Sequence, residues 1–309
     1  MSPGTLPRRR RRRRGVVLSW NGREDTLACL DSLRHVTYSP LLVVAVDNGS
    51  ADGSADAIAA AHPDVVLVRL ESNRGFAGGT NSGIRKALEH GADAVLMLNN
   101  DMLVEPGFVE PLVDATAADV TAGAACSQIL FADPPGRIWY AGASFRPNRG
   151  HHGRNLHFGE PPLDALMPPY STECGCAGAM FVSRDVLEHV GLLDEDLFAY
   201  REDLDWSLRA RALGRTVLVV PASVVRHKVS ASTGGEASPT SLYYDVRNGL
   251  VVAERYAPLG RSRTALRRAE SALAHLAQGV GSHHRGASVR AVIAGCRDAR
   301  HGRLGPRPQ

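Results

Sequence analysis

The sequence lacks any apolar run that approaches the roughly 20 residues needed to cross a bilayer. The apolar stretch 16–18 is too short for the core of a signal peptide. The five cysteines are an odd number without framework spacing, and a single residue separates Cys174 from Cys176 where a zinc knuckle or redox motif has two. These absences predict a cytoplasmic protein with reduced, mostly buried thiols. They leave peripheral attachment to the inner face of a membrane as an alternative.

Two common nucleotide-binding signatures are also missing. The sequence contains no Gly-x-x-x-x-Gly-Lys-Ser/Thr, which disfavours a P-loop ATPase. The glycines at positions 75, 78 and 79 do not have the spacing of the dinucleotide fingerprint, and they follow the third expected strand where that fingerprint follows the first.

The charge of the chain is unevenly distributed over its 309 residues. The net charge is +4, but residues 8–14 contribute +7 and residues 255–309 contribute +9, so the body 15–254 carries −12. An acidic body with basic ends argues against binding of nucleic acid and fits a body that collects carboxylates for a cation. We expect residues 1–14 to be a disordered polyarginine tail. The basic ends either contact anionic lipid head groups or face solvent.

Short apolar runs alternate with helical patterns in the first half of the chain. Strands are expected at 15–20, 41–46, 65–70 and 94–98, with a helix between each pair. Unbroken apolar runs of this length are typical of strands buried on both faces. The pattern predicts an α/β fold with a mostly parallel central sheet and helices on both faces, followed by a helical extension over 241–309.

Polar residues follow three of the expected strands. Asp47 ends the second, a glycine-rich loop 73–81 follows the third, and Asn99, Asn100 and Asp101 end the fourth. The carboxyl ends of parallel strands meet at one edge of a sheet, where ligands bind. Free N–H groups of a glycine-rich loop suit phosphate or ribose oxygens, and one carboxylate backed by two amides suits a hard cation. The alternative is a set of ordinary polar turns.

Taken together, these motifs resemble the family 2 glycosyltransferases of GT-A fold, and most closely their rhamnosyltransferase-like branch. The resemblance covers roughly residues 15–255. It rests on Ser19-Trp20-Asn21, Val46-Asp47-Asn48-Gly49-Ser50, Asn73-Arg74-Gly75-Phe76-Ala77-Gly78-Gly79-Thr80-Asn81 and Leu98-Asn99-Asn100-Asp101.

The resemblance implies that residues 15–125 bind a nucleotide-diphosphate sugar donor. The family's base-contacting aspartate corresponds to Asp47. The family's Asp-x-Asp motif binds a divalent cation, Mg²⁺ or Mn²⁺, and here its first carboxylate is missing, which leaves Asp101 as the metal ligand. His227 matches a family histidine beside the metal or diphosphate, with a structural role as the alternative. The implied donor-binding residues are Ser19, Asn21, Asp47, Asn48, Asn73, Gly75, Phe76, Asn81, Asn99 and Asn100.

The resemblance also implies that residues 126–240 form the acceptor-binding and catalytic half of the same domain. Glu202 and Asp203 match the family's Glu-Asp motif, whose second acid is the catalytic base. Asp203 is therefore the expected base. Glu202 is the first alternative, and Asp205 is the second. The alternative is that acids merely favour a helix N-terminus. We expect the helix start to keep Asp203 ionised, and only one of the two acids to face the acceptor. The implied acceptor-side residues are Gly178, Ala179, Trp206 and Arg247.

Two further expectations concern the second half of the chain. The Ser, Thr, Gly and Pro residues of 230–240 are typical of a mobile loop that closes over the donor. His151 and His152 are expected at the surface, because no acidic residue lies at ligand spacing from them.

The implied function is an inverting glycosyltransferase of hexosyltransferase type, which acts in cell-wall or polysaccharide biosynthesis. A carboxylate takes the proton of the acceptor hydroxyl while the sugar leaves its diphosphate. The Gln-x-x-Arg-Trp motif of processive members is absent, which favours a non-processive enzyme. The acceptor is a glycan, a lipid-linked sugar or a small molecule. The alternatives are a nucleotidyltransferase, which should carry a basic glycine-rich loop at 21–24, and a non-catalytic nucleotide-sugar-binding protein, which would lack the acid at 203.

Overall fold

The computed structural model describes residues 13–229 and 238–308. Residues 1–12 of the expected disordered tail lie outside the described residues. Residues 230–237 of the expected closing loop do so as well. The first strand begins at Arg13, two residues earlier than the sequence pattern suggests.

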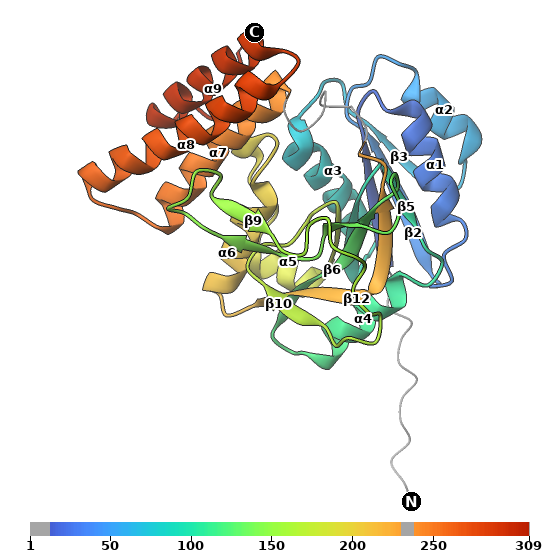
Figure 1. The fold of residues 1–309 in the computed structure, drawn as a ribbon. Helices are drawn as coiled ribbons and strands as arrows, with labels where there is room; N and C mark the ends of the chain where they lie inside the picture. The colour runs from blue at the N-terminus through green and yellow to red at the C-terminus, as the bar shows by residue number, and fades with distance from the viewer. Residues whose placement is uncertain (1–12, 230–237, 309) are drawn as a thin grey trace, which may run out of the picture.

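The first half of the fold is a parallel sheet with a helix after each of its first three strands (Figure 1). Its strands pair in the order β3-β2-β1-β4, each parallel to its neighbour. They are β1 (Arg13–Ser19), β2 (Leu41–Asp47), β3 (Val66–Arg69) and β4 (Ala94–Asn99), and the helices are α1 (Arg23–Leu33), α2 (Ser54–Ala61) and α3 (Gly75–Glu89). The α/β prediction is confirmed, and the polar clusters follow β2, β3 and β4 at one edge.

Within residues 13–229 and 238–308, the second half extends the same sheet to ten strands. Strand β11 (Ala179–Ser183) runs antiparallel between β4 and β6 (Ala122–Phe131), and β6 is parallel to the long strand β12 (Thr216–His227). The remaining elements are β5 (Met102–Val104), β7 (Ile138–Tyr140), β10 (Tyr170–Thr172), α4 (Val109–Ala118), α5 (Arg184–Val190), the 3-10 turn η1 (Glu195–Leu197) and α6 (Glu202–Ala212). A separate hairpin of β8 (Ala143–Phe145) and β9 (Gly153–Asn155) lies beside the sheet.

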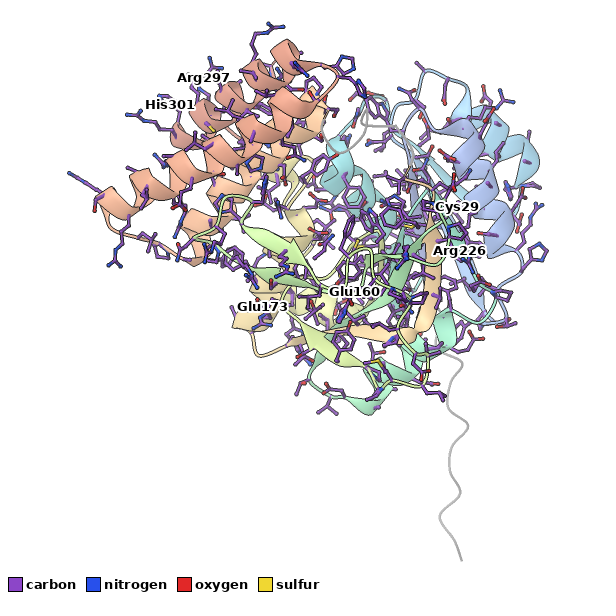
Figure 2. All side chains as sticks on the ribbon, viewed as in Figure 1. Cys29, Glu160, Glu173, Arg226, Arg297 and His301 are labelled. Atoms are coloured by element: carbon purple, nitrogen blue, oxygen red, sulfur yellow. The ribbon has the colours of Figure 1, made fainter. Side chains whose placement is uncertain are left out.

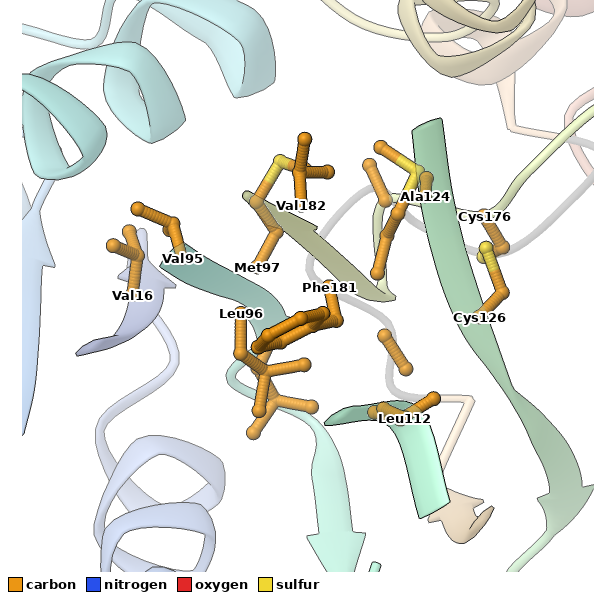
Figure 3. Packing of buried hydrophobic residues seen from close by; sticks show 14 of the residues in the cluster. Val16, Val95, Leu96, Met97, Leu112, Ala124, Cys126, Cys176, Phe181 and Val182 are labelled. Carbon is orange, nitrogen blue, oxygen red and sulfur yellow. The ribbon is translucent and has the colours of Figure 1, made fainter. Parts of the chain in front are cut away.

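The core is centred on the strands in the middle of the sheet. Val95, Leu96 and Met97 of β4 are at most 1% exposed, and Phe181 of β11 packs beside them (Figure 3). Because these strands are covered on both faces, alternation of apolar and polar residues is absent and the strands appear in the sequence as continuous apolar runs.

Glycines let helix α3 approach the sheet closely. A Cβ atom at Gly79 would collide with the side chain of Leu18, and one at Gly83 would collide with Val16. The close approach brings the start of α3, and the loop before it, to the carboxyl edge of β1 and β2.

Three C-terminal helices form a layer beside the second half of the sheet (Figure 1). They are α7 (Pro239–Tyr256), α8 (Arg261–Gly281) and α9 (Arg285–Arg300), and α7 packs against both of the others. Among the described residues, no helix combines the length and the apolar character that a membrane span requires.

A buried carboxylate joins α6 to this helical layer. Asp205 is fully buried and accepts hydrogen bonds from Arg209 Nε at 2.9 Å and from the hydroxyl of Tyr256 at 2.9 Å. Arg255 binds both Asp205 and Asp194, the latter at 2.9 Å. Asp205 is therefore saturated by its neighbours and is a structural anchor, so it is not a reserve catalytic base.

Replacing Asp205 with asparagine should lower the free energy of unfolding by about 3 kcal/mol, because two arginines lose a buried counter-charge. Urea denaturation measures the change. Asp56→Asn is the control, since its ion pair with Arg69 leaves the two side chains 84% and 51% exposed, and its loss should cost under about 1 kcal/mol. Equal losses in the two variants would contradict the anchoring role.

Candidate active site

A cavity of about 1310 Å³ opens at the carboxyl edge of the sheet. One side is formed by the end of β4 and by the segment 174–178 that precedes β11. The other sides are formed by the start of α6, the β8–β9 hairpin and residues of α7 and α8. The position agrees with the rule that ligands bind beyond the carboxyl ends of parallel strands.

The two residues predicted as metal ligands meet in this cavity. His227 Nε2, at the end of β12, lies 3.0 Å from Oδ2 of Asp101, although 126 positions separate the residues in the sequence. Their side chains are only 9% and 10% exposed. Strand β5 pairs antiparallel with the end of β12, which places His227 opposite Met102 and so brings the histidine next to Asp101.

The surroundings of this pair offer further ligand atoms. Oδ1 of Asn99 and Nδ1 of His227 are buried and have no hydrogen-bond partner in the described part of the chain. Asn100 also lines the cavity, where its Nδ2 donates to Thr26 Oγ1 at 2.9 Å. A carboxylate, an amide oxygen and an imidazole fit a divalent cation such as Mg²⁺ or Mn²⁺ that also binds phosphate oxygens.

The end of β2 presents an unsatisfied carboxylate oxygen. Asp47 is 4% exposed, and its Oδ2 accepts from the backbone N–H of Ser50 at 3.2 Å. Its Oδ1 is buried without a hydrogen-bond partner among the described residues. Asn48, the next residue, lines the cavity, and Asp47 is not among the lining residues.

Two of the predicted donor-binding residues support the turn after β1. Ser19 is fully buried and accepts from Thr26 Oγ1 at 2.8 Å, and Asn21 Oδ1 accepts from the backbone N–H of Ala51 at 2.8 Å. Neither residue lines the cavity, whereas Trp20 between them does. The prediction identified the right turn and the wrong side chains, because the two polar groups bond to neighbouring backbone and side chains.

The loop before α3 contributes three of the predicted donor-binding residues, Asn73, Gly75 and Phe76, to the cavity lining. Asn73 Oδ1 accepts from the backbone N–H of Gly75 at 2.7 Å and from Asn48 Nδ2 at 3.0 Å, which fixes the loop. Gly75 has a φ of +72°, and a Cβ atom there would collide with Phe198. Glycine is required at this point by both the backbone conformation and the close contact.

Glu202 and Asp203 both line the cavity. That only one of them faces the acceptor stays a prediction. Asp203 Oδ1 accepts from the backbone N–H of Leu204 at 2.8 Å, whereas Oε2 of Glu202 is buried without a hydrogen-bond partner in the described residues. Ser207 joins the acids to the segment 174–178, since its hydroxyl donates to Asp203 O at 2.7 Å and accepts from Gly175 N at 2.9 Å.

Burial raises the pKa of both carboxyl groups. The pKa of Glu202 is raised well above its usual range by burial and then by the charge of Asp203. Burial also raises the pKa of Asp203, although the N–H of Leu204 and the charge of Arg201 counteract it. We expected the helix start to favour the ionised form of Asp203, but loss of water outweighs the helix dipole and its pKa is raised. Asp203 is nevertheless the better stabilised anion of the two.

Of the predicted acceptor-side residues, Gly178 lines the cavity and three others do not. Ala179 is buried in β11, and Trp206 is fully buried with its indole N–H donating to Gly191 O at 2.9 Å. Arg247 is fully buried too, and it donates to Leu197 O at 2.9 Å. These residues support the site from the core, which corrects their assignment to the acceptor.

Asn81 and His152 also lie elsewhere than predicted. Asn81 donates to Leu193 O at 2.9 Å and so ties α3 to the segment before η1, away from the cavity lining. His152 is fully buried and contacts Pro147 O and Ser271 Oγ, each at 3.1 Å, which corrects its expected place at the surface. Burial lowers the pKa of His152 to about 4.

Sequence reasoning missed several residues of the cavity lining, because they come from β7, the β8–β9 hairpin, the residue before α6, the helical layer and the C-terminal segment. They carry aromatic or basic side chains: Trp139, His151, Arg154, Arg201, Tyr244 and Arg307. No local motif marks them, and only the excess of arginine after residue 255 hinted that the C-terminal part contributes positive charge.

Residues 16–191 match the family model of glycosyl transferase family 2. The chain is 28% identical over 268 residues to the N-acetylglucosaminyl-diphospho-decaprenol L-rhamnosyltransferase of Mycobacterium tuberculosis, which covers 80% of this chain and 86% of that protein. It is 27% identical over 255 residues to the dTDP-rhamnosyl transferase RfbF of Shigella flexneri, with 79% and 81% covered.

Solved structures of glycosyltransferases share the fold. GalNAc-T7 with UDP, GalNAc and Mn²⁺ superposes with a TM-score of 0.59 at 18% identity, over 84% of this chain and 54% of that one. The mannosyltransferase PcManGT from Pyrobaculum calidifontis, with GDP-Man and Mn²⁺, gives 0.53 at 19% identity, over 94% and 75%. The GT-A fold is thereby confirmed. The family match covers more than half of the chain, so the protein belongs to glycosyl transferase family 2 and is a rhamnosyltransferase-like glycosyltransferase.

Proposed function

We propose that the protein is an inverting, non-processive rhamnosyltransferase that uses a nucleotide-diphosphate sugar. The observation that carries this proposal is that one cavity receives both the Asp101–His227 pair and the Glu202–Asp203 pair. The Asp101–His227 pair could hold a cation that also binds a diphosphate. The Glu202–Asp203 pair could take a proton from an acceptor hydroxyl. Membership in a glycosyltransferase family decides against the nucleotidyltransferase alternative.

The donor would lie along the edge formed by β2, β4 and the loop before α3. The unpaired Oδ1 of Asp47 would accept an N–H group of the base, which removes the penalty of a buried unpaired acceptor. Asp101, Asn99 and His227 would hold a Mg²⁺ or Mn²⁺ ion together with the diphosphate. When bound, this ion neutralises charge that develops on the leaving group.

Asp203 would take the proton of the acceptor hydroxyl as the new glycosidic bond forms. Burial raises the pKa of both acids, and the charge of Asp203 raises the pKa of Glu202 further. The N–H of Leu204 and the charge of Arg201 stabilise the anion of Asp203, which favours Asp203 over Glu202 as the base. A base whose pKa is raised toward the working pH accepts a proton more effectively than an ordinary aspartate.

The relatives suggest the substrates. One is named for dTDP-rhamnose and another for an N-acetylglucosaminyl-diphospho-decaprenol acceptor, and we propose the same classes of donor and acceptor here. Arg154, Arg201 and Arg307 line the cavity, and their charge suits a diphosphate-linked acceptor. We further propose that residues 15–125 hold the donor, residues 126–240 hold the acids and acceptor, and residues 241–309 complete the acceptor end, while residues 1–14 serve as a basic tail.

A lipid-linked acceptor lies at a membrane, and helix α8 presents a surface suited to one. Leu266, Leu273 and Val280 recur every seven residues and are 60%, 67% and 53% exposed. Arg261 and Arg263 at the start of α8 are exposed as well, and Figure 2 shows Arg297 and His301 at the outer side of the neighbouring helix α9. Apolar side chains at helical spacing beside arginines fit the surface of an anionic bilayer.

Replacing Asp203 with asparagine should lower kcat by roughly 10²-fold or more, because shape is kept and basicity is lost. Donor affinity, measured by calorimetry, should stay near wild type. Because burial raises the pKa of Asp203, the base form is lost as pH falls through a raised value, and the acid limb of the wild-type kcat/KM profile should lie above the usual range of an aspartate. Glu202→Gln is the matched control and should retain more activity. The reverse order would identify Glu202 as the base.

Removing the carboxylate of Asp101 should weaken binding of a nucleoside diphosphate in the presence of Mn²⁺ by about tenfold or more, since one cation ligand is lost. Calorimetry with and without Mn²⁺ measures the effect in Asp101→Asn. Asp164→Asn, at an exposed position outside the cavity, should bind like wild type. Equal affinity with and without the cation in the wild-type protein would refute the cation's role.

The double substitution Leu266→Ser, Leu273→Ser should reduce binding to vesicles that contain anionic phosphatidylglycerol by about tenfold or more, because two apolar side chains no longer enter the interface. Flotation with these vesicles and with neutral phosphatidylcholine vesicles measures it. Val120→Ser is the control, since Val120 is 87% exposed and lies between α4 and β6. Unchanged flotation of the double variant would exclude this surface.

A further inference from the structure

Three potential metal ligands from distant parts of the chain meet at the helical end of the cavity. They are His151, from the segment before β9, Asp245 of α7 and His275 of α8, and one ligand atom of each lies within 4.8 Å of those of the others. His151 and Asp245 line the cavity. None of the three has a part in the proposed sugar transfer, so the cluster calls for a separate explanation.

The position of one proton on His275 can be assigned from its contacts. Its Nδ1 lies 2.8 Å from the backbone carbonyl oxygen of Ser271, and since a carbonyl only accepts, Nδ1 carries the hydrogen. Nε2 then points at Oδ2 of Asp245, 3.2 Å away. If the ring is neutral, the lone pair of Nε2 faces a carboxylate oxygen, and the two atoms repel each other. Either a cation lies between the two atoms, or Nε2 carries a second proton. An Nδ1–H bonded to a backbone carbonyl is the usual way in which a metal-ligating histidine is oriented.

The carboxylate of Asp245 is ionised and is held in place. Burial would raise the pKa of Asp245, but the charge of Arg201 and the contact with His275 outweigh burial and keep it well below the usual range. Arg201 Nε lies 2.7 Å from Oδ1, which leaves Oδ2 directed at His275. Nη2 of Arg201 also donates to the backbone oxygen of His151 at 2.9 Å. Arg201 therefore positions two of the three candidate ligands.

His151 supplies the second imidazole of the cluster. The two histidine rings lie with their centroids 4.6 Å apart and are tilted by 58°. Two imidazoles and one carboxylate are a ligand set of zinc and related transition metals, whereas Mg²⁺ prefers oxygen ligands.

We propose that His151, Asp245 and His275 form a second metal site that binds a divalent transition-metal ion of the Zn²⁺ class. It is separate from the Asp101 site and does not depend on the proposed sugar transfer. The ion would join the segment before β9 to α7 and α8. Through Arg201 it would also brace the turn before Glu202, where Phe198, Tyr200 and Arg201 all have positive φ angles.

The first test is Zn²⁺ binding to the full-length protein after treatment with EDTA. The titration is made in wild type and in Asp101→Asn, because this variant lacks a ligand of the Asp101 site. Both proteins should bind Zn²⁺ at the site of His151, Asp245 and His275. Adding His151→Gln should weaken this binding by at least about tenfold, the scale of losing a metal-site group. His151 is exposed, so its variant should fold. His189→Gln is the control, because its side chain is 66% exposed and contacts only its own helix.

Two further readouts do not depend on activity. In the Asp101→Asn background, Zn²⁺ should raise the thermal unfolding midpoint, and adding His151→Gln should abolish this rise, since only binding to the folded state stabilises it. Bound Co²⁺ should give visible d–d absorption in Asp101→Asn that is lost when His151→Gln or His275→Gln is added. If Asp101→Asn with His151→Gln binds Zn²⁺ and Co²⁺ as Asp101→Asn alone does, the proposal is wrong, and His275 is then a protonated partner of Asp245.

Discussion

The cost of burying carboxylates is the constraint on which the site depends. Asp205 and Asp245 are placed against arginines at 2.9 Å or closer, and each becomes a fixed anion that joins two segments. Glu202 and Asp203 are buried beside them without a comparable partner, because Arg201 is committed to Asp245. Burial therefore raises the pKa of Glu202 and of Asp203, whereas the charge of Arg201 holds the pKa of Asp245 below its usual range. The fold concentrates its uncompensated negative charge at one place, and perturbed titration in a cavity marks a functional site.

The central sheet explains why this place is opposite the cation site. Strand β11 runs antiparallel beside β4, so the segment 174–178 that leads into β11 lies next to Asn99 at the end of β4. Ser207 of α6 holds the same segment through Gly175. Helix α6 and the segment 174–178 thus link the two acids to the end of β4, two residues before Asp101. Movement of α6 would change the separation of the two groups that the reaction needs to coordinate.

The donor end of the cavity could be predicted from the sequence, because strand ends create it. Asp47 and Asn99 follow apolar runs directly, Asn73 and Asp101 come within three residues of one, and parallel pairing brings such strand ends together. The sequence does not distinguish these residues from polar residues whose side chains point away from the cavity. Ser19, Asn21 and Asn81 have suitable chemistry, but their polar groups form hydrogen bonds with neighbouring backbone or side chains. A motif does not show which way a side chain points. Trp206 and Arg247 are buried by contacts far away in the sequence.

The acceptor end could not be predicted, for a different physical reason. Its residues come from the hairpin, α7, α8 and the C-terminal segment, and they converge only after the helical layer packs. His151, Asp245 and His275 illustrate this, since the last two lie 94 and 124 positions after the first and no local spacing signals a shared site. A helical layer packed beside this sheet can also change its polar residues without disturbing the strand ends. The end of the cavity where we propose the donor then follows from the fold, while the end where we propose the acceptor depends on how the C-terminal helices complete the cavity, and we expect substitutions that alter acceptor specificity in that layer.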